Sequence, residues 1–325
     1  MIVTVTLNPA IDKIYWVDQL RIGEEAREEF LIRAIRSQTS AGGKGVNISI
    51  FLARLGVENV AMGFVGGHTG HVVVRDLRDE GVTTNFVWVE GETRTNVTVL
   101  ERGREFIPIM VDEEGQEVSS AELDRFLRRY KRIIPRAEWV VLAGSLPPGV
   151  DSDIYRFLAV QAKEAGAKVA VMAGGHPLTR VLAASPELVK PDTREHLAME
   201  KAPLTTRDKI ITAGKKVVAQ GVGMVIISHE VIGDLVVTKD NIWYIESRVP
   251  ATQFKNLVGA DDALVGGILY KLYTGAPIEE ALRFGMAAGI ASAESEEKLC
   301  KDMQEIEREM SHISLTPMGG GDAGQ

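Results

Sequence analysis

The chain has 325 residues, of which 45% are hydrophobic and 25% are charged, and its formal net charge is -8 at pH 7. This balance is typical of a soluble globular protein, and the length suits one large α/β domain or two ordinary ones. The acidic excess argues against nucleic acid or an anionic membrane as the main partner, although a local basic pocket stays possible.

Several features indicate a cytoplasmic protein. A single cysteine, Cys300, excludes an internal disulfide and fits a reducing compartment. No stretch approaches the roughly 20 apolar residues of a membrane span. Residues 1–12, MIVTVTLNPAID, lack the basic region and cleavage site of a signal peptide. In that compartment the N-x-S/T matches at Asn47 and Asn96 are not glycosylation sites.

The first 120 residues are predicted to contain strands and helices in irregular order. Residues 2–7, IVTVTL, predict a strand because they are short and β-branched. Residues 13–38 mix aromatic and charged side chains without a helical stripe, which predicts partly exposed strands. Further predicted elements are a helix ending on a glycine at 45–56, strands at 58–65, 85–90 and 95–100, and a helix near 70–80.

From about residue 120 onward, strands and helices alternate regularly. Each predicted helix precedes a strand, and the pairs are 121–134 with 138–144, 153–165 with 167–175, and 205–219 with 223–229. Such alternation implies βαβ units and a mostly parallel sheet. Two strands are then expected at 235–238 and 242–246, helices from about 262 to 310, and a disordered tail over 313–325.

Residues 256–268, NLVGADDALVGGI, place two adjacent carboxylates, Asp261 and Asp262, between a turn and an apolar helix. The free N–H groups at the start of a helix form an anion site. A carboxylate there can be a plain N-cap. Alternatively, the turn holds a phosphoryl group while one aspartate takes a proton from an attacking hydroxyl.

Three other segments carry polar groups suited to a ligand. Residues 40–47, SAGGKGVN, join glycines to Lys44 without the spacing of a P-loop or a dinucleotide fingerprint, so they predict either close approach of the backbone to a ligand or a loop. Residues 142–150, LAGSLPPGV, follow a buried strand, where open α/β sheets bind ligands. Arg94, in GETRTN, suits a phosphate, although a lone arginine is usually solvated.

Six motifs occur along the chain in one order: Asn8-Pro9-Ala10-Ile11-Asp12, AGGKGVN (41–47), GFVGGHTG (63–70), TRTN (93–96), GSLPPG (144–149) and VGADDALVGG (258–267). Together they resemble the PfkB/ribokinase family, and within it the branch of 1-phosphofructokinase and tagatose-6-phosphate kinase. The resemblance spans roughly residues 2–310. It implies a ribokinase-like three-layer α/β/α fold with a central, mostly parallel sheet, a small β lid from about 13–40 and 88–112, and a single kinase domain over 1–312.

The resemblance also implies an ATP- and Mg²⁺-dependent kinase for fructose 1-phosphate, fructose 6-phosphate or tagatose 6-phosphate. The family's G-A-G-D motif aligns with Gly259–Asp262, so that Asp262 matches the catalytic base. The matched substrate-side residues are Asp12, Arg27, Gly43, Lys44, Asn47, Arg94, Asn96 and Ser145. The matched nucleotide-side residues are Lys190, Asp192, Ser228, Glu230, Gly259, Ala260 and Asp261, with Asp192 and Glu195 as Mg²⁺ ligands.

Several positions depart from the family pattern. Asp261 replaces the third glycine of G-A-G-D and adds a negative charge where a phosphate should bind. Two unit charges ~5 Å apart repel each other by about 1–3 kcal/mol, which is expected to slow catalysis. Met172 and Glu230 replace polar or glycine positions near the phosphates, whereas Asp192 keeps an oxygen ligand in place of asparagine. Thr98 stands where fructose-1-phosphate kinases often have lysine. A kinase for an unphosphorylated sugar or nucleoside, or a weakened sugar-phosphate-binding relative, therefore stays open.

The lid segments predict a partner. Trp16, Leu20, Phe30 and Ile32 are apolar residues in a small sheet that a monomer would expose. Pairing of lid to lid in a two-fold homodimer would cover them.

Overall fold

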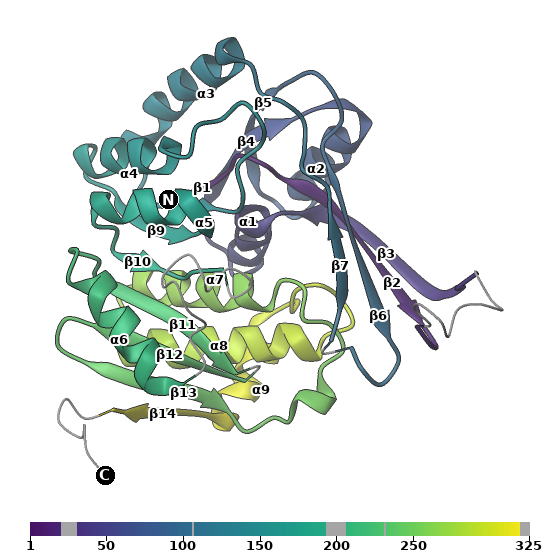
Figure 1. Ribbon diagram of the computed structural model, residues 1–325, viewed down its shortest axis with the longest axis vertical. Coiled ribbons are helices and arrows are strands. Elements are labelled where there is room, and N and C mark those ends of the chain that lie inside the picture. Colours follow the sequence, from purple (N-terminus) through teal and green to yellow (C-terminus); the bar gives the residue numbers. More distant parts are fainter. Residues whose placement is uncertain (21–30, 106, 193–205, 231, 319–325) are drawn as a thin grey trace.

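The computed structural model describes residues 1–20, 31–105, 107–192, 206–230 and 232–318 (Figure 1). A ten-stranded sheet runs through its larger part, in the order β14-β13-β12-β11-β10-β9-β8-β1-β4-β5. The strands from β11 to β5 pair in parallel, and β12, β13 and β14 continue the sheet in antiparallel fashion at one edge. The strands are Ile2–Thr6 (β1), Asn59–Val65 (β4), Thr83–Trp88 (β5), Trp139–Ala143 (β8), Lys168–Met172 (β9), Leu188–Val189 (β10), Met224–Glu230 (β11), Gly233–Thr238 (β12), Ile242–Ser247 (β13) and Ile313–Pro317 (β14).

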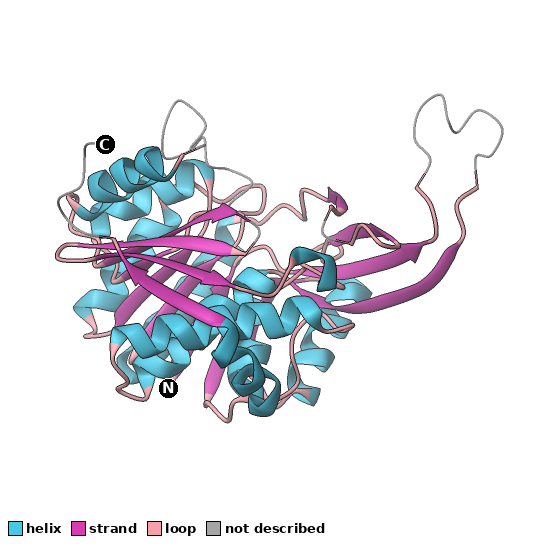
Figure 2. Cartoon of the chain, turned by 90° about the horizontal axis from the view of Figure 1, so that it is seen from below, coloured by secondary structure: helices cyan, strands magenta, loops and turns pink. Residues whose placement is uncertain are grey.

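Helices cover both faces of this sheet (Figure 2), which confirms the expected three-layer α/β/α architecture with a mostly parallel centre. Successive side chains of a strand point to opposite faces, so Ile2 joins one core and Val3 the other. The first core packs under α1 (Lys44–Arg54), α2 (Gly67–Asp79), α7 (Ala260–Tyr273), α8 (Ile278–Glu294) and α9 (Met303–Glu309). The second packs under α3 (Ser120–Ile133), α4 (Ile154–Glu164), α5 (Gly175–Val181) and α6 (Arg207–Val218).

A second, four-stranded sheet projects from the body of the molecule, in the order β3-β2-β6-β7 (Figures 1 and 2). Its strands are Ala10–Val17 (β2), Ala34–Gly42 (β3), Thr95–Glu101 (β6) and Ile109–Asp112 (β7). They come from the two segments expected to form the lid, which confirms a small second sheet. Because β2 continues directly from β1, the small sheet is joined to the carboxyl ends of the large one.

The small sheet buries some of its apolar residues within the chain. Trp16 packs with Ile14 and Leu100, and the Arg36 guanidinium lies 4.7 Å from its ring. The expectation that Trp16 needs cover from a partner is therefore wrong. Leu20 is half-buried, Ile32 is exposed, and Phe30 lies outside the described residues.

The expected disordered tail is wrong for Ile313–Pro317, which form β14 against β13. Buried Ile313 anchors this strand, and the Arg283 side chain donates a 2.8 Å hydrogen bond to its carbonyl oxygen. The short strand pattern of residues 313–317 was overlooked because a glycine-rich end follows it. Residues 319–325 lie outside the described part. Within that part, no helix is long and apolar enough to cross a membrane.

Candidate active site

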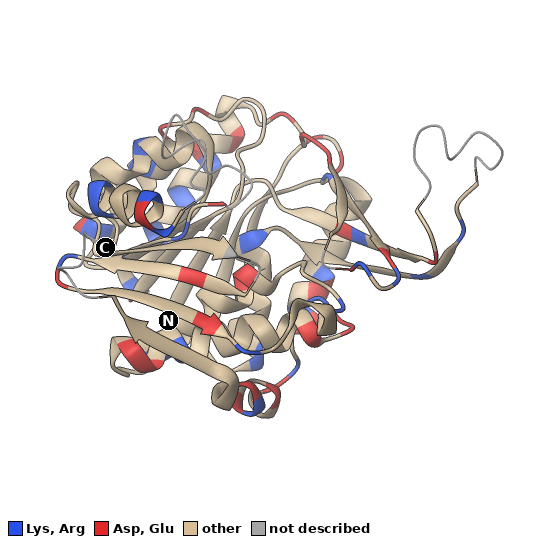
Figure 3. Cartoon of the chain, turned by 60° about the horizontal axis from the view of Figure 1, so that its bottom comes forward, with Lys and Arg blue, Asp and Glu red and all other residues tan. Residues whose placement is uncertain are grey.

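A pocket of about 1040 Å³ opens where the large sheet meets the small one, at the carboxyl ends of the parallel strands. Figure 3 shows acidic and basic segments side by side in this region. The predicted residues that line the pocket are Asp12, Gly43, Lys44, Asn47, Arg94, Asn96, Ser145, Asp192, Ser228, Gly259, Ala260, Asp261 and Asp262. Arg27, Glu195 and the side chain of Glu230 lie outside the described part of the chain. This edge is where open α/β sheets bind ligands.

Two helices begin at the pocket with a glycine in a left-handed backbone conformation. Gly259 precedes α7 with φ 87°, and Gly43 precedes α1 with φ 99°. A Cβ added to Gly259 would also lie 2.8 Å from the Lys298 carbonyl oxygen, so this position requires glycine for two reasons. The first turn of each helix has N–H groups without intrahelical partners, which makes both ends suitable for an anion.

Asp262 lies in the first turn of α7 and is buried. Its Oδ2 accepts a 2.6 Å hydrogen bond from Asn47 Nδ2, and within the described residues its Oδ1 has no hydrogen-bond partner. Burial raises the pKa of Asp262 and outweighs the opposing effects of the Lys44 charge and the Asn47 hydrogen bond. A carboxylate in this state favours taking up a proton.

Asp12, on β2, lies across the pocket and is also buried. Its Oδ1 accepts a 3.3 Å hydrogen bond from Asn96, and its Oδ2 lies 3.0 Å from the ammonium of Lys298. The sequence analysis missed Lys298, which sits in the charged run S-E-E-K and resembles a solvated surface residue. Its partner is 286 positions away, so no local pattern could have identified the pair.

Asp261 has a cationic partner that the sequence did not reveal. Lys190 is fully buried, and its Nζ lies 3.2 Å from Asp261 Oδ1, 3.2 Å from Asp234 Oδ1 and 2.8 Å from Ser228 Oγ. Burial alone would lower the pKa of Lys190, but the charges and hydrogen bonds of the two aspartates raise it overall. Lys190 therefore lies behind the pocket wall, where it compensates part of the negative charge of Asp261.

Lys44 and Asp192 form an ion pair at 3.2 Å across the floor of the pocket. Both were predicted, Lys44 for the substrate phosphate and Asp192 for Mg²⁺. Carboxylate oxygens suit Mg²⁺, which commonly binds through one or two carboxylates together with substrate phosphates. Within the described residues, no group of three or more His, Cys, Asp or Glu side chains could hold a metal alone. As a single carboxylate, Asp192 fits the part that such a residue plays when Mg²⁺ binds together with phosphate.

Arg94 is fixed at the opposite wall of the pocket. Its Nε and Nη1 donate to the carbonyl oxygens of Asn8 and Glu113, at 3.2 and 2.9 Å. Asn8 in turn donates to Ser145 Oγ at 3.3 Å. Arg94 and Ser145, which belong to separate sequence motifs, thus meet in one polar wall.

Comparisons with known proteins agree with this geometry. The model of the pfkB family carbohydrate kinases matches residues 5–299. The chain is 35% identical to 1-phosphofructokinase of Bacillus subtilis (strain 168), over 91% of this chain and 94% of that one. It is 31% identical to D-tagatose-1-phosphate kinase of Bacillus licheniformis, over 97% and 99% of the two chains.

Two solved structures extend the comparison. A crystal structure of a possible 1-phosphofructokinase from Thermotoga maritima superposes with a TM-score of 0.88 at 35% identity, over 98% of this chain and 99% of that one. Phosphofructokinase-2 from Escherichia coli in complex with substrates and products gives a TM-score of 0.84 at 29% identity, over 95% and 98%. The similarity therefore covers the small sheet as well as the body.

Proposed function

Because the chain belongs to the pfkB family of carbohydrate kinases, and is thus a sugar kinase, we propose that it transfers phosphate from ATP to a ketohexose phosphate, with fructose 1-phosphate as the first candidate. The carrying observation is that Asp262, at the N-terminus of α7, and Asp12, on the small sheet, face one pocket. The relatives named 1-phosphofructokinase and D-tagatose-1-phosphate kinase support a ketohexose 1-phosphate.

Asp262 is the proposed base. It accepts the proton of the attacking sugar hydroxyl while Asn47 keeps its carboxylate in place. Apart from that of Ala260, which donates to the Leu257 carbonyl oxygen at 3.2 Å, the N–H groups of the Gly259–Asp262 turn stabilise the phosphoryl group as its charge is redistributed. Asp12 accepts hydrogen bonds from other sugar hydroxyls and so fixes which hydroxyl reaches Asp262.

Lys44, Arg94 and Ser145 are the described residues proposed for the sugar phosphate. Among the described residues that line the pocket, carboxylates still outnumber basic side chains by seven to two, and Lys298 and Lys190 pair with only two of them, Asp12 and Asp261. The seven are Asp12, Asp112, Glu113, Glu114, Asp192, Asp261 and Asp262. Two polyanionic substrates therefore require a further cation. Mg²⁺ bound with ATP supplies that charge, and Asp192 is the described carboxylate proposed to hold it.

Asp261 favours one alternative, a weakened relative that binds the sugar phosphate and turns it over slowly. Its carboxylate occupies the first turn of α7, where a phosphoryl group would bind. A kinase for an unphosphorylated sugar or nucleoside is the other alternative, supported by the small number of basic residues among the described residues that line the pocket.

A coupled assay of ADP release with Mg-ATP separates these readings. The acceptors are fructose 1-phosphate, fructose 6-phosphate, tagatose 1-phosphate, tagatose 6-phosphate, the parent sugars and a nucleoside. We expect the highest kcat/KM with fructose 1-phosphate, and loss of that activity in Asp262→Asn. Turnover of unphosphorylated sugars alone would overturn the proposal. Calorimetric binding of a phosphosugar together with only slow turnover would identify the weakened relative.

The exposed apolar residues of the small sheet support a homodimer formed through it. Leu31, Ile32 and Ile35 precede or belong to β3, and Ile109 and Val111 belong to β7. These residues lie at the two edge strands of a projecting sheet, and exposed apolar residues at such edges are typical of an interaction surface.

A further inference from the structure

The loop between α8 and α9, residues 295–302, sends one side chain to the sugar side of the pocket. Lys298 is buried, and its ammonium donates to Asp12 Oδ2 at 3.0 Å and to the carbonyl oxygen of Ala41. Burying a lysine is unfavourable unless its charge is compensated and its hydrogen bonds are satisfied. Here both partners belong to the small sheet, so the interaction crosses from the body to the lid.

Three groups fix the carboxylate of Asp12. Asn96 and Lys298 each bind one oxygen. The backbone of Gly42 lies directly beneath, because a Cβ added there would be 2.2 Å from Asp12 Cγ. The position of the carboxylate is therefore determined before a sugar binds, and its remaining lone pairs face the pocket that it lines.

The main chain of Lys298 contacts the opposite side of the site. Its carbonyl oxygen packs on Gly259, the residue that starts α7. Its ammonium charge also favours the ionised form of Asp262. One residue thus touches the sugar-binding aspartate with its side chain and the phosphoryl-binding turn with its backbone.

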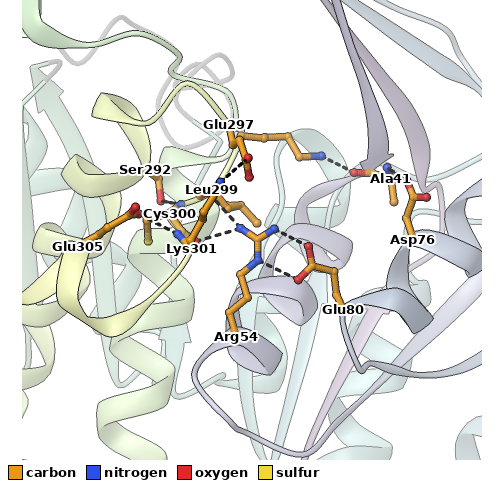
Figure 4. Close-up of polar contacts among 11 residues, drawn as sticks. Ala41, Arg54, Asp76, Glu80, Ser292, Glu297, Leu299, Cys300, Lys301 and Glu305 are labelled. Atoms are coloured by element: carbon orange, nitrogen blue, oxygen red, sulfur yellow. Dashed lines mark hydrogen bonds and ion pairs between the residues drawn. The ribbon is translucent and has the colours of Figure 1, made fainter.

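The loop that carries Lys298 is itself firmly held (Figure 4). Arg54, the last residue of α1, pairs with Glu80 and donates to the carbonyl oxygens of Leu299 and Cys300 at 3.1 and 3.0 Å. The Cys300 N–H donates to Ser292 Oγ at 3.1 Å, and Cys300 is buried. Because the main chain directly after Lys298 is fixed, its ammonium has little freedom to leave Asp12.

We propose that Lys298 is a positioning residue, which orients Asp12 toward the sugar hydroxyls and so sets the affinity for the sugar substrate. The inference rests on the proposed function, in which Asp12 binds those hydroxyls. Lys298 lies outside the six sequence motifs, in a loop that contacts both the sugar side and the phosphoryl side of the site.

Lys298→Met tests this role in the intact protein. We expect KM for fructose 1-phosphate to rise about 10- to 100-fold, with KM for ATP changed by less than about 3-fold, because contacting charged pairs are strongly coupled. Lys298→Arg, which keeps the charge, should recover most of the loss. Lys301→Met is the matched control, since this lysine lies three positions away in the same loop, its side chain is 60% exposed, and its ammonium pairs with half-buried Glu297 at 2.8 Å.

A double-mutant cycle with Asp12→Asn separates positioning from a general structural role. If Lys298 acts through Asp12, adding Lys298→Met to Asp12→Asn changes KM by less than about 3-fold. The double variant carries no unpaired buried charge, so it provides the test even if Lys298→Met alone does not fold. A further loss above about 10-fold in the double variant would overturn the inference.

Failure of this inference is distinguishable from failure of the proposed function. Wild-type protein without turnover of any sugar phosphate would overturn both. Active wild-type protein together with Lys298→Met at wild-type Michaelis constants would overturn this inference alone. Equal rises in KM for the sugar and for ATP would also overturn it, since they would indicate general damage to the pocket.

Discussion

At the residue scale, the proposed chemistry depends on the buried carboxylate of Asp262. Asp262→Asn keeps the shape of the side chain and its contact with Asn47, but the amide cannot accept the sugar proton. We expect kcat to fall about 10²- to 10⁴-fold, with both Michaelis constants nearly unchanged. Steady-state ADP release measures this, with Asp261→Asn as the neighbouring comparison. Near-wild-type kcat in Asp262→Asn together with loss of activity in Asp261→Asn would exchange the roles of the two aspartates.

The same substitution is expected to stabilise the protein. Burial raises the pKa of Asp262, so near neutral pH the folded state holds a charged form that folding disfavours. We expect the Tm of Asp262→Asn to exceed that of the wild type by about 1–3 °C at pH 8. As pH falls through the raised pKa, the folded wild type takes up a proton before the unfolded chain does, and the difference shrinks. Thermal melts from pH 8 to pH 5 test this, and a difference that grows toward acid would contradict it.

Asp261 is expected to slow the reaction without abolishing it. Lys190 is paired with both Asp234 and Asp261, so one negative charge of this trio stays uncompensated beside the phosphoryl site. A repulsion of about 1–3 kcal/mol corresponds to roughly 5–150-fold in rate, and the pairing with Lys190 places the effect at the lower end. Asp261→Gly should therefore raise kcat about 5-fold at saturating Mg-ATP. A kcat of Asp261→Gly below that of the wild type would instead show that the ion pair between Asp261 and Lys190 contributes to catalysis.

The motifs predicted much of the pocket lining, because five of the six contribute described residues to it, and only GFVGGHTG (63–70) does not. The contact between Asn47 and Asp262 joins two of them, and that between Asp12 and Asn96 joins two more. Lys298 and Asp234 were missed, since ion pairs between distant positions leave no periodic trace in a sequence. For the same reason the sequence did not reveal that Lys190 pairs with Asp261, and the charge of Asp261 was treated as uncompensated.

At the element scale, β14 closes the antiparallel edge of the large sheet. Deleting residues 313–325 removes this strand, the burial of Ile313 and the hydrogen bond from Arg283. We expect Tm to fall by about 3–10 °C, as loss of one buried isoleucine suggests, and aggregation to increase because β13 becomes an open edge. A chain ending at Met318 retains β14 and is the matched control. Equal melting temperatures of the two truncated chains would contradict the prediction.

The elements with strong periodicity were predicted, and the short ones were not. The regular alternation of helix and strand patterns between residues 120 and 230 correctly predicted α3, β8, α4, β9, α6 and β11. In contrast, β10 has two residues and α5 has seven with a glycine and a proline, too few to show a period. The predicted helical stretch from 262 to 310 is three helices, because Gly275 and the 295–302 loop interrupt it.

At the scale of the whole molecule, we expect a dimer through the small sheet. Met110 lines the pocket, so its neighbour Val111, which is 62% exposed, points to the outer face. Val111→Lys should lower the mass measured by light scattering at micromolar concentration from that of a dimer to that of a monomer. Phe157→Lys is the control, because Phe157 is an exposed apolar residue on α4, away from this sheet. An active protein that is already monomeric would rule out the dimer.

The buried thiol of Cys300 makes the chain convenient for fluorescence work. Burial raises the pKa of this thiol to about 11, so at neutral pH it presents almost no thiolate to a maleimide dye. Since it is the sole cysteine of the sequence, a second one introduced by Val111→Cys becomes the only fast-reacting site. A dye attached there reports the approach of another subunit or the movement of β7, because Cys300 remains unlabelled. Conversely, the rate at which the dye labels Cys300 itself measures how often the loop that carries Lys298 opens.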